Sequence, residues 1–117
     1  MNLLDILTAG RDLPKGCDTW AVRTIRPDFR SSHDYRYPFP GRWAKAPGPI
    51  NRAWRGNCPS DPGDGICAAS NWAGMASAGV PANVLLLVAY SSSDILGTGG
   101  GDKVRLRRMF IVDIIDG

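Results

Sequence analysis

Alternation of apolar and polar positions, together with one unbroken apolar run, predicts three strands. Residues 18–25 (DTWAVRTI) alternate and are rich in β-branched side chains, which favours a strand. Residues 83–90 (NVLLLVAY) are apolar throughout, a pattern typical of a strand buried on both faces. Residues 103–115 (KVRLRRMFIVDII) are the longest candidate. The apolar positions that share one parity there are Val104, Leu106, Phe110, Val112 and Ile114.

Helical spacing predicts two further elements. Residues 2–9 form a short N-terminal helix, for which Asn2 can serve as the N-cap and Gly10 is placed to end it. Small and apolar residues recur at helical spacing between Gly65 and Gly79. We therefore expect a helix at about 66–78, packed on the sheet.

The segment 26–65 differs from the rest of the chain, because it holds seven of the nine prolines and has no regular period. Proline removes a backbone donor and fixes φ, so we expect a long irregular excursion here. Its many aromatic residues indicate that it packs against something. Together these elements predict a single α+β domain over 1–117, with a small, mostly antiparallel sheet.

The amino-acid composition excludes one class of reaction mechanism. All 11 acidic residues are aspartate, and both glutamate and glutamine are missing from the sequence. A mechanism that needs an in-chain glutamate as base or metal ligand is therefore excluded. The loss of two strong helix formers also argues against a mostly helical fold.

Charge is strongly polarised along the chain. Residues 23–55 carry eight basic and two acidic side chains, a local charge of +6, whereas 56–102 carry four aspartates and no Lys or Arg. Arginine interleaved with aromatic residues is typical of surfaces that bind phosphates and stack bases. Alternatively, arginine stems cover exposed rings and pair with the acidic half. The candidate binding residues are Arg23, Arg26, Arg30, Arg36, Arg42, Trp43, Arg52, Trp54 and Arg55.

Other motifs carry weaker signals. Cys17, His33, Cys58 and Cys67 could supply four zinc ligands, but no CxxC pair exists, so isolated apolar thiols are favoured. GTGGGDKV at 97–104 lacks the Gly-Lys-Ser/Thr of a phosphate loop and precedes a strand pattern. We interpret it as an inter-strand turn, and we expect neither a metal nor another cofactor.

Three cysteines cannot all pair within one chain, which fits a reducing compartment. The N-terminus has no basic n-region and no apolar run is long enough to span a bilayer. We therefore expect a cytoplasmic protein with no membrane partner.

Two resemblances add expectations. The pieces from GDGICAASNWAGMASAG through VLLLVAYSSSDILG to DKVRLRRMFIVDIID, with PFPGRWAKAPGPI, resemble small uncharacterised proteins of actinobacteria and their phages. A remoter similarity is to the ADP-ribosyltransferase-like fold, which implies that Arg23 in TWAVRTI binds a dinucleotide phosphate. That family's catalytic glutamate has no counterpart here.

These observations favour a non-enzymatic binding or interaction domain of phage or actinobacterial origin. Its partner would be anionic, either nucleic acid or an acidic protein surface. Two alternatives stay open: a phage virion component (capsid or tail accessory protein) whose proline-rich arm lies on neighbouring subunits or which self-assembles, and a nucleotide-binding enzyme of the ADP-ribosyltransferase type. A phage-encoded protein would reside in the host cytoplasm or in the virion.

Overall fold

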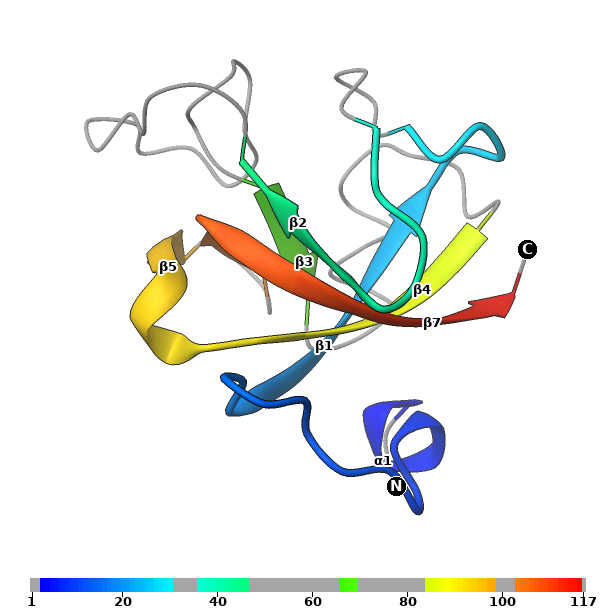
Figure 1. The fold of residues 1–117 in the computed structure, drawn as a ribbon, viewed down its shortest axis with the longest axis horizontal. Helices are drawn as coiled ribbons and strands as arrows, with labels where there is room; N and C mark the ends of the chain where they lie inside the picture. Colours follow the sequence, from blue (N-terminus) through cyan, green and yellow to red (C-terminus); the bar gives the residue numbers. More distant parts are fainter. Residues whose placement is uncertain (1–2, 31–35, 47–65, 70–83, 99–102, 117) are drawn as a thin grey trace.

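The computed structural model describes residues 3–30, 36–46, 66–69, 84–98 and 103–116. Over these residues the chain forms the helix α1 (Leu3–Leu7), a 3-10 turn η1 (Ser92–Asp94) and seven strands (Figure 1). The strands are β1 (Thr19–Ile25), β2 (Arg42–Lys45), β3 (Ile66–Ala69), β4 (Val84–Tyr90), β5 (Ile95–Thr98), β6 (Lys103–Leu106) and β7 (Arg108–Asp116).

All seven strands belong to one sheet in the order β2-β7-β4-β1-β3-β6-β5, and every neighbouring pair is antiparallel. Strands lie where 18–25 and 83–90 predict them, and β4 is buried at all seven positions. The expected α+β class is wrong. The described part of the chain is an antiparallel sheet whose one α-helix is the short α1, and the larger helix that we expected to pack on the sheet is not found in it.

The predicted helix at 66–78 accounts for much of this error. Its first residues, Ile66–Ala69, are the strand β3, and all four are buried. The remaining residues of that prediction lie outside the described ranges. β3 pairs with β1 on one side and β6 on the other, so tertiary pairing overrides the helical spacing of its alanines.

The strand predicted at 103–115 is divided at Arg107 into β6 and β7. The buried apolar positions change parity at this break, from Leu106 in β6 to Met109 and Ile111 in β7. The face that we predicted from alternation alone is therefore wrong for the first part of β7, and further along β7 the pairing with β4 has two register shifts that alternation does not predict.

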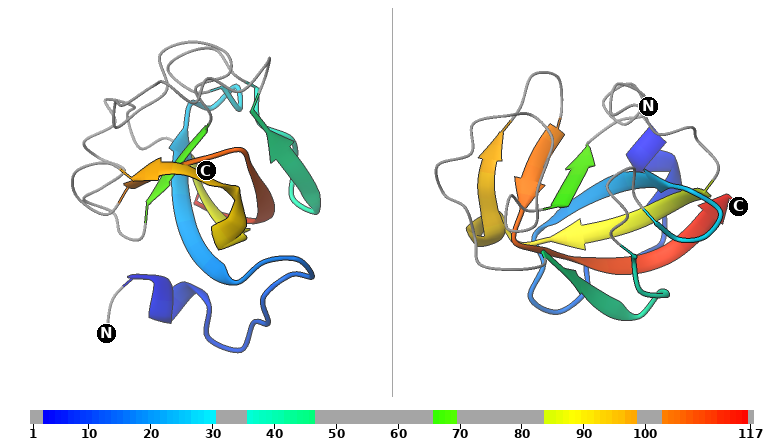
Figure 2. Two further views of the ribbon diagram at one scale, coloured as in Figure 1. Left: turned by 90° about the vertical axis from the view of Figure 1, so that its left-hand side faces the viewer. Right: turned by 90° about the horizontal axis from the view of Figure 1, so that it is seen from above.

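Arg107 also brings the two edges of the sheet together. Its N–H donates to the carbonyl of Asp94, just before β5, at 2.9 Å. Its carbonyl accepts from the N–H of Ala46, just after β2, at 2.8 Å. Since β2 and β5 are the two ends of the strand order, the sheet is strongly curved (Figure 2).

The curved sheet has two apolar clusters. The larger fills its inner face and includes Ile25, Leu86 and Met109. The smaller, on the opposite face, contains Val22, Ala69 and Leu85, with Leu4, Leu7 and Ile115 packed against it. The predicted N-terminal helix is confirmed as α1, and through Leu4 and Leu7 it covers part of the outer face. Within the described ranges, α1 falls well short of the length and apolarity that a membrane-spanning helix requires.

Candidate functional site

The chain between β1 and β2 is ordered where the structure describes it. The N–H of Arg26 donates to the carbonyl of Arg30, Arg30 pairs with Arg36 in an isolated bridge, and the N–H of Tyr37 donates to the carbonyl of Phe29 at 2.7 Å. Together with β2, this structure corrects the expectation that 26–65 is wholly irregular; residues 31–35 and 47–65 lie outside the described ranges.

Two backbone features direct this segment toward β2. Phe29 has a φ of 63°, which a bulky side chain rarely adopts, and its ring packs edge-on against Phe39 at 5.1 Å between centroids. Gly41 has a φ of +92°, which favours glycine, and its N–H donates to the carbonyl of Ile111 at the start of β2.

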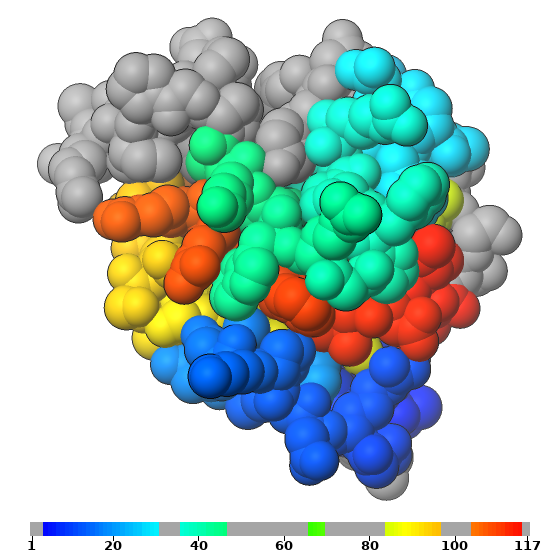
Figure 3. Space-filling model, viewed as in Figure 1, coloured from blue at the N-terminus to red at the C-terminus, as the bar shows by residue number. Residues whose placement is uncertain are grey.

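A hollow of about 490 Å³ opens between this segment and β2. Figure 3 shows residues 36–46 on the surface above β7. The described residues that line the hollow are Phe29, Arg36, Tyr37, Pro38, Phe39, Arg42, Trp43 and Lys45. We call these eight residues the basic aromatic hollow.

The hollow combines positive charge with rings. Arg36, Arg42 and Lys45 are exposed, none of the eight described lining residues is acidic, and none of the three cations pairs with a described carboxylate. Phe39 is 63% exposed, whereas Tyr37 is buried in the inner core. The hollow can therefore offer charge and one accessible ring to a ligand.

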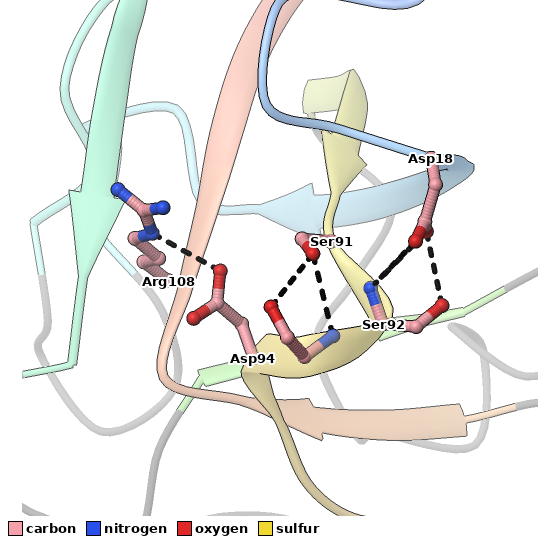
Figure 4. Close-up of polar contacts among 6 residues, drawn as sticks. Asp18, Ser91, Ser92, Asp94 and Arg108 are labelled. Atoms are coloured by element: carbon pink, nitrogen blue, oxygen red, sulfur yellow. Dashed lines mark hydrogen bonds and ion pairs between the residues drawn. The ribbon is translucent and has the colours of Figure 1, made fainter.

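Trp43 is held by its neighbours on the outer face of the sheet. The guanidinium of Arg108 lies over its ring, with Cζ 4.1 Å from the centroid, and Phe110 packs edge-on at 5.4 Å. Arg108 in turn donates from Nε to the buried carboxylate of Asp94 at 3.0 Å (Figure 4). This chain of contacts fixes one wall of the hollow.

The structure distributes the predicted site residues unevenly. Arg36, Arg42 and Trp43 come together in the hollow. Arg26 and Arg30 are half-buried beside the bridge described above, and Arg26 lies 3.6 Å from the carboxylate of Asp28. The predicted residues that lie outside the described ranges are Arg52, Trp54 and Arg55.

Arg23 does not line the hollow. It is 5% exposed and has the strand parity of Ala21 and Ile25, so it lies on the inner face of the sheet. One of its terminal nitrogens donates to the carbonyl of Cys67 at 3.2 Å, and its Cζ lies 5.3 Å from the Tyr37 ring centroid. Its Nε has no hydrogen-bond partner.

The sequence prediction of the site missed Phe29, Tyr37, Phe39 and Lys45. The aromatic residues were expected to pack, and Lys45 contributes to the basic segment, so the signal was present in composition. What the sequence did not indicate is that the chain before β2 folds back, so that Phe29, Tyr37 and Phe39 lie in the same hollow as Lys45 of β2.

The other candidate motifs do not assemble into a site in the described ranges. Cys17 is half-buried and Cys67 is buried, while His33 and Cys58 lie outside those ranges. Burial raises the pKa of the Cys17 thiol, against an opposing effect of Arg108. No group of three or more described His, Cys, Asp or Glu residues is arranged to hold a metal ion.

The two ends of GTGGGDKV lie in the neighbouring strands β5 and β6, and the turn that we predicted would have to lie between them. Thr98 at the end of β5 and Val104 in β6 are antiparallel partners, and 99–102 lie outside the described ranges.

A second polar cluster ties the start of β1 to η1. Asp18 accepts a hydrogen bond from the Thr19 hydroxyl at 2.6 Å. It also accepts from the backbone N–H and the hydroxyl of Ser92, as Figure 4 shows. These donors, Thr19 first, lower the pKa of Asp18. Nearby, burial raises the pKa of Tyr90. Because these bonds join the start of β1 to η1, we assign the cluster a structural role.

This cluster leads to a prediction on pH. Because the folded-state pKa of Asp18 lies below the ordinary 3.8, its carboxylate stabilises the fold above that pH, and the contribution is lost as the pH falls through the folded-state value. We expect Asp18→Asn to lower the thermal midpoint at pH 7 and the difference from wild type to vanish at lower pH. Thermal melts between pH 2 and pH 7 measure this, with Asp12→Asn as a charge-matched control. An equal difference at every pH would contradict the prediction.

Comparison with protein families, with curated proteins and with solved structures finds no match to this chain. The resemblances to actinobacterial and phage proteins and to the ADP-ribosyltransferase-like fold therefore stay predictions.

Proposed function

We propose that this protein is a non-enzymatic binding module that holds an anionic partner in the basic aromatic hollow. The observation that carries the proposal is the convergence of Arg36, Arg42 and Lys45 around one opening without an acidic neighbour among the described lining residues. Like charges held close together raise the local positive potential, and an anionic partner relieves it.

The construction of the hollow supports binding by a preformed surface. Tyr37 is anchored in the core, and Trp43 is held between Arg108 and Phe110. Little ordering of these walls is then needed on association, which lowers the entropic cost of binding. The unusual φ of Phe29 fits the same idea, since strained backbone persists where surrounding structure enforces it.

The cellular location and the origin that we propose are those that the sequence indicates. We propose that the protein acts in the cytoplasm, or in a virion if it is encoded by a phage. The virion component and the ADP-ribosyl-transferring enzyme remain the alternatives.

The proposal predicts salt-dependent binding that requires the cations of the hollow. Two labelled probes serve: a ten-residue oligothymidylate and an acidic decapeptide of alternating glutamate and valine. We expect at least one to bind at low ionic strength, with an affinity that falls steeply as salt is added. Arg36→Ala/Arg42→Ala should weaken that binding about tenfold and flatten the salt dependence. Fluorescence anisotropy titrations at several salt concentrations measure both quantities.

The matched control is Arg11→Ala/Lys15→Ala, which removes the same charge from positions that do not line the hollow. It should change affinity by less than about twofold. If neither probe binds at low ionic strength, or if both double variants weaken binding equally, the proposed function is wrong.

A further inference from the structure

We infer that the partner of the basic aromatic hollow is an acidic peptide segment in extended conformation, which adds as a further strand to the open edge of β2, by which we mean the edge that pairs with no described strand. This inference rests on the proposed function and names the class of partner for the same site. It also assigns a role to the backbone of β2, which the charge argument leaves out.

The first observation is the position of β2 in the sheet. It stands at one end of the strand order, pairs with β7 on one side, and has no strand of the described part of the chain on the other. An edge strand presents a row of N–H and C=O groups to which an extended segment can bond.

The second observation identifies which groups of β2 face outward. The N–H of Ala46 donates to Arg107, and the ladder direction alternates from residue to residue in an antiparallel pair. Arg42 and Ala44 therefore point their backbone groups at β7. Trp43 and Lys45 point theirs away from it, toward the open edge.

The third observation is that the hollow lies along this strand. Three of its lining residues, Arg42, Trp43 and Lys45, belong to β2 itself. A segment bonded to the edge would thus run through the hollow. Its alternate side chains would reach Lys45 and Arg36, and these cations select carboxylates.

The rings of the hollow favour a peptide over a single-stranded nucleic acid. Proteins that bind single strands stack successive bases on several accessible aromatic faces. Here Phe39 is the one aromatic side chain of the hollow that is strongly exposed, Tyr37 is 3% exposed, and a face of Trp43 is covered by Arg108. One accessible ring suits an apolar side chain of an extended peptide.

The test compares four probes on the intact protein by anisotropy. They are the glutamate–valine decapeptide, two versions of it that are N-methylated at the alternate backbone amides of one edge or of the other, and the ten-residue oligothymidylate. N-methylation removes the donors of one peptide edge and leaves its charge unchanged. We expect the unmodified peptide to bind more tightly than the oligothymidylate. We expect N-methylation on the edge that faces β2 to weaken binding about tenfold, and on the other edge to have little effect.

A pair of variants tests the protein side of the same bonds. Lys45→Ala removes the charge, whereas Lys45→Pro also removes the outward N–H and breaks no bond to β7. We expect Lys45→Pro to bind the peptide about fivefold more weakly than Lys45→Ala. Thermal melts show whether each variant is folded, and the N-methylated peptides provide the same comparison on wild type if the proline variant is not.

The outcomes separate the two proposals. Tighter binding of the oligothymidylate, or equal binding of the methylated and unmodified peptides, overturns the peptide inference and leaves an anion-binding function standing. Failure of both the peptide and the oligothymidylate to bind overturns both proposals.

Discussion

Leu86→Ala should lower the free energy of unfolding by about 3 kcal/mol, one of the largest effects that a single truncation has on this fold. Leu86 is fully buried in the inner cluster, on a strand that pairs with β1 on one side and β7 on the other. Removing its side chain loses the transfer free energy of three carbons and leaves a cavity. Strands on both sides of β4 restrict the collapse that would fill this cavity. Urea unfolding followed by tryptophan fluorescence measures the change, with an unchanged slope as the test that the unfolded state is not altered.

The control for this variant is a substitution on the neighbouring strand. Ile114 is the register partner of Leu86 on β7, in a stretch where the pairing of β4 with β7 has two register shifts, and it is 39% exposed whereas Leu86 is fully buried. Ile114→Ala should cost about 1 kcal/mol or less, since little apolar area is lost. Similar costs for the two variants would contradict the difference in burial that the structure gives to these two partners.

The comparison of these two positions shows how far local pattern determines this fold. β4 was predictable because a strand with neighbours on both sides and cover on both faces must be apolar throughout. β1 was predictable from its β-branched alternation. In both strands the residue types along the strand itself are enough to indicate a strand, whatever its neighbours in the sheet are.

Prediction failed where neighbours distant in sequence decide the outcome. Ala68 and Ala69 are compatible with a helix, and they form a strand because β1 and β6 lie on either side of them. The break at Arg107 exists because its backbone bonds to Asp94 and to Ala46. Neither contact leaves a local signal in the sequence.

The candidate site, too, was predictable only where the residues of one segment carry the signal. Composition indicated a basic aromatic surface between 23 and 55, and Arg36, Arg42 and Trp43 do come together. The position of Arg23 was not predictable from charge. Its neighbours in the strand, Val22 and Thr24, face the other side, so alternation alone turns the arginine inward.

Arg23→Met should raise the free energy of unfolding by about 2 kcal/mol. The guanidinium is buried on the inner face, its Nε has no hydrogen-bond partner, and it forms no ion pair with a described carboxylate. Leaving a buried polar atom unsatisfied costs about 1–3 kcal/mol, and a buried charge adds to that cost. Methionine has a similar length, fills the same space and can contact the Tyr37 ring through sulfur. For the variant to be more stable, the stabilisation from removing the buried charge must exceed the loss of the cation–π contact and of the hydrogen bond to the Cys67 carbonyl.

Arg23→Lys separates charge from volume, because lysine keeps the charge but has a compact ammonium in place of the planar fork over Tyr37. It should be less stable than wild type, while Arg23→Met is more stable. A loss of stability in the methionine variant would show that the guanidinium contributes more through Cys67 and Tyr37 than its burial costs. The methionine variant also tests whether Arg23 takes part in binding. Because Arg23 does not line the basic aromatic hollow, Arg23→Met should keep wild-type affinity for the probe that binds. A stabilised variant that no longer bound would instead place Arg23 in the binding machinery, as charge along the sequence suggested.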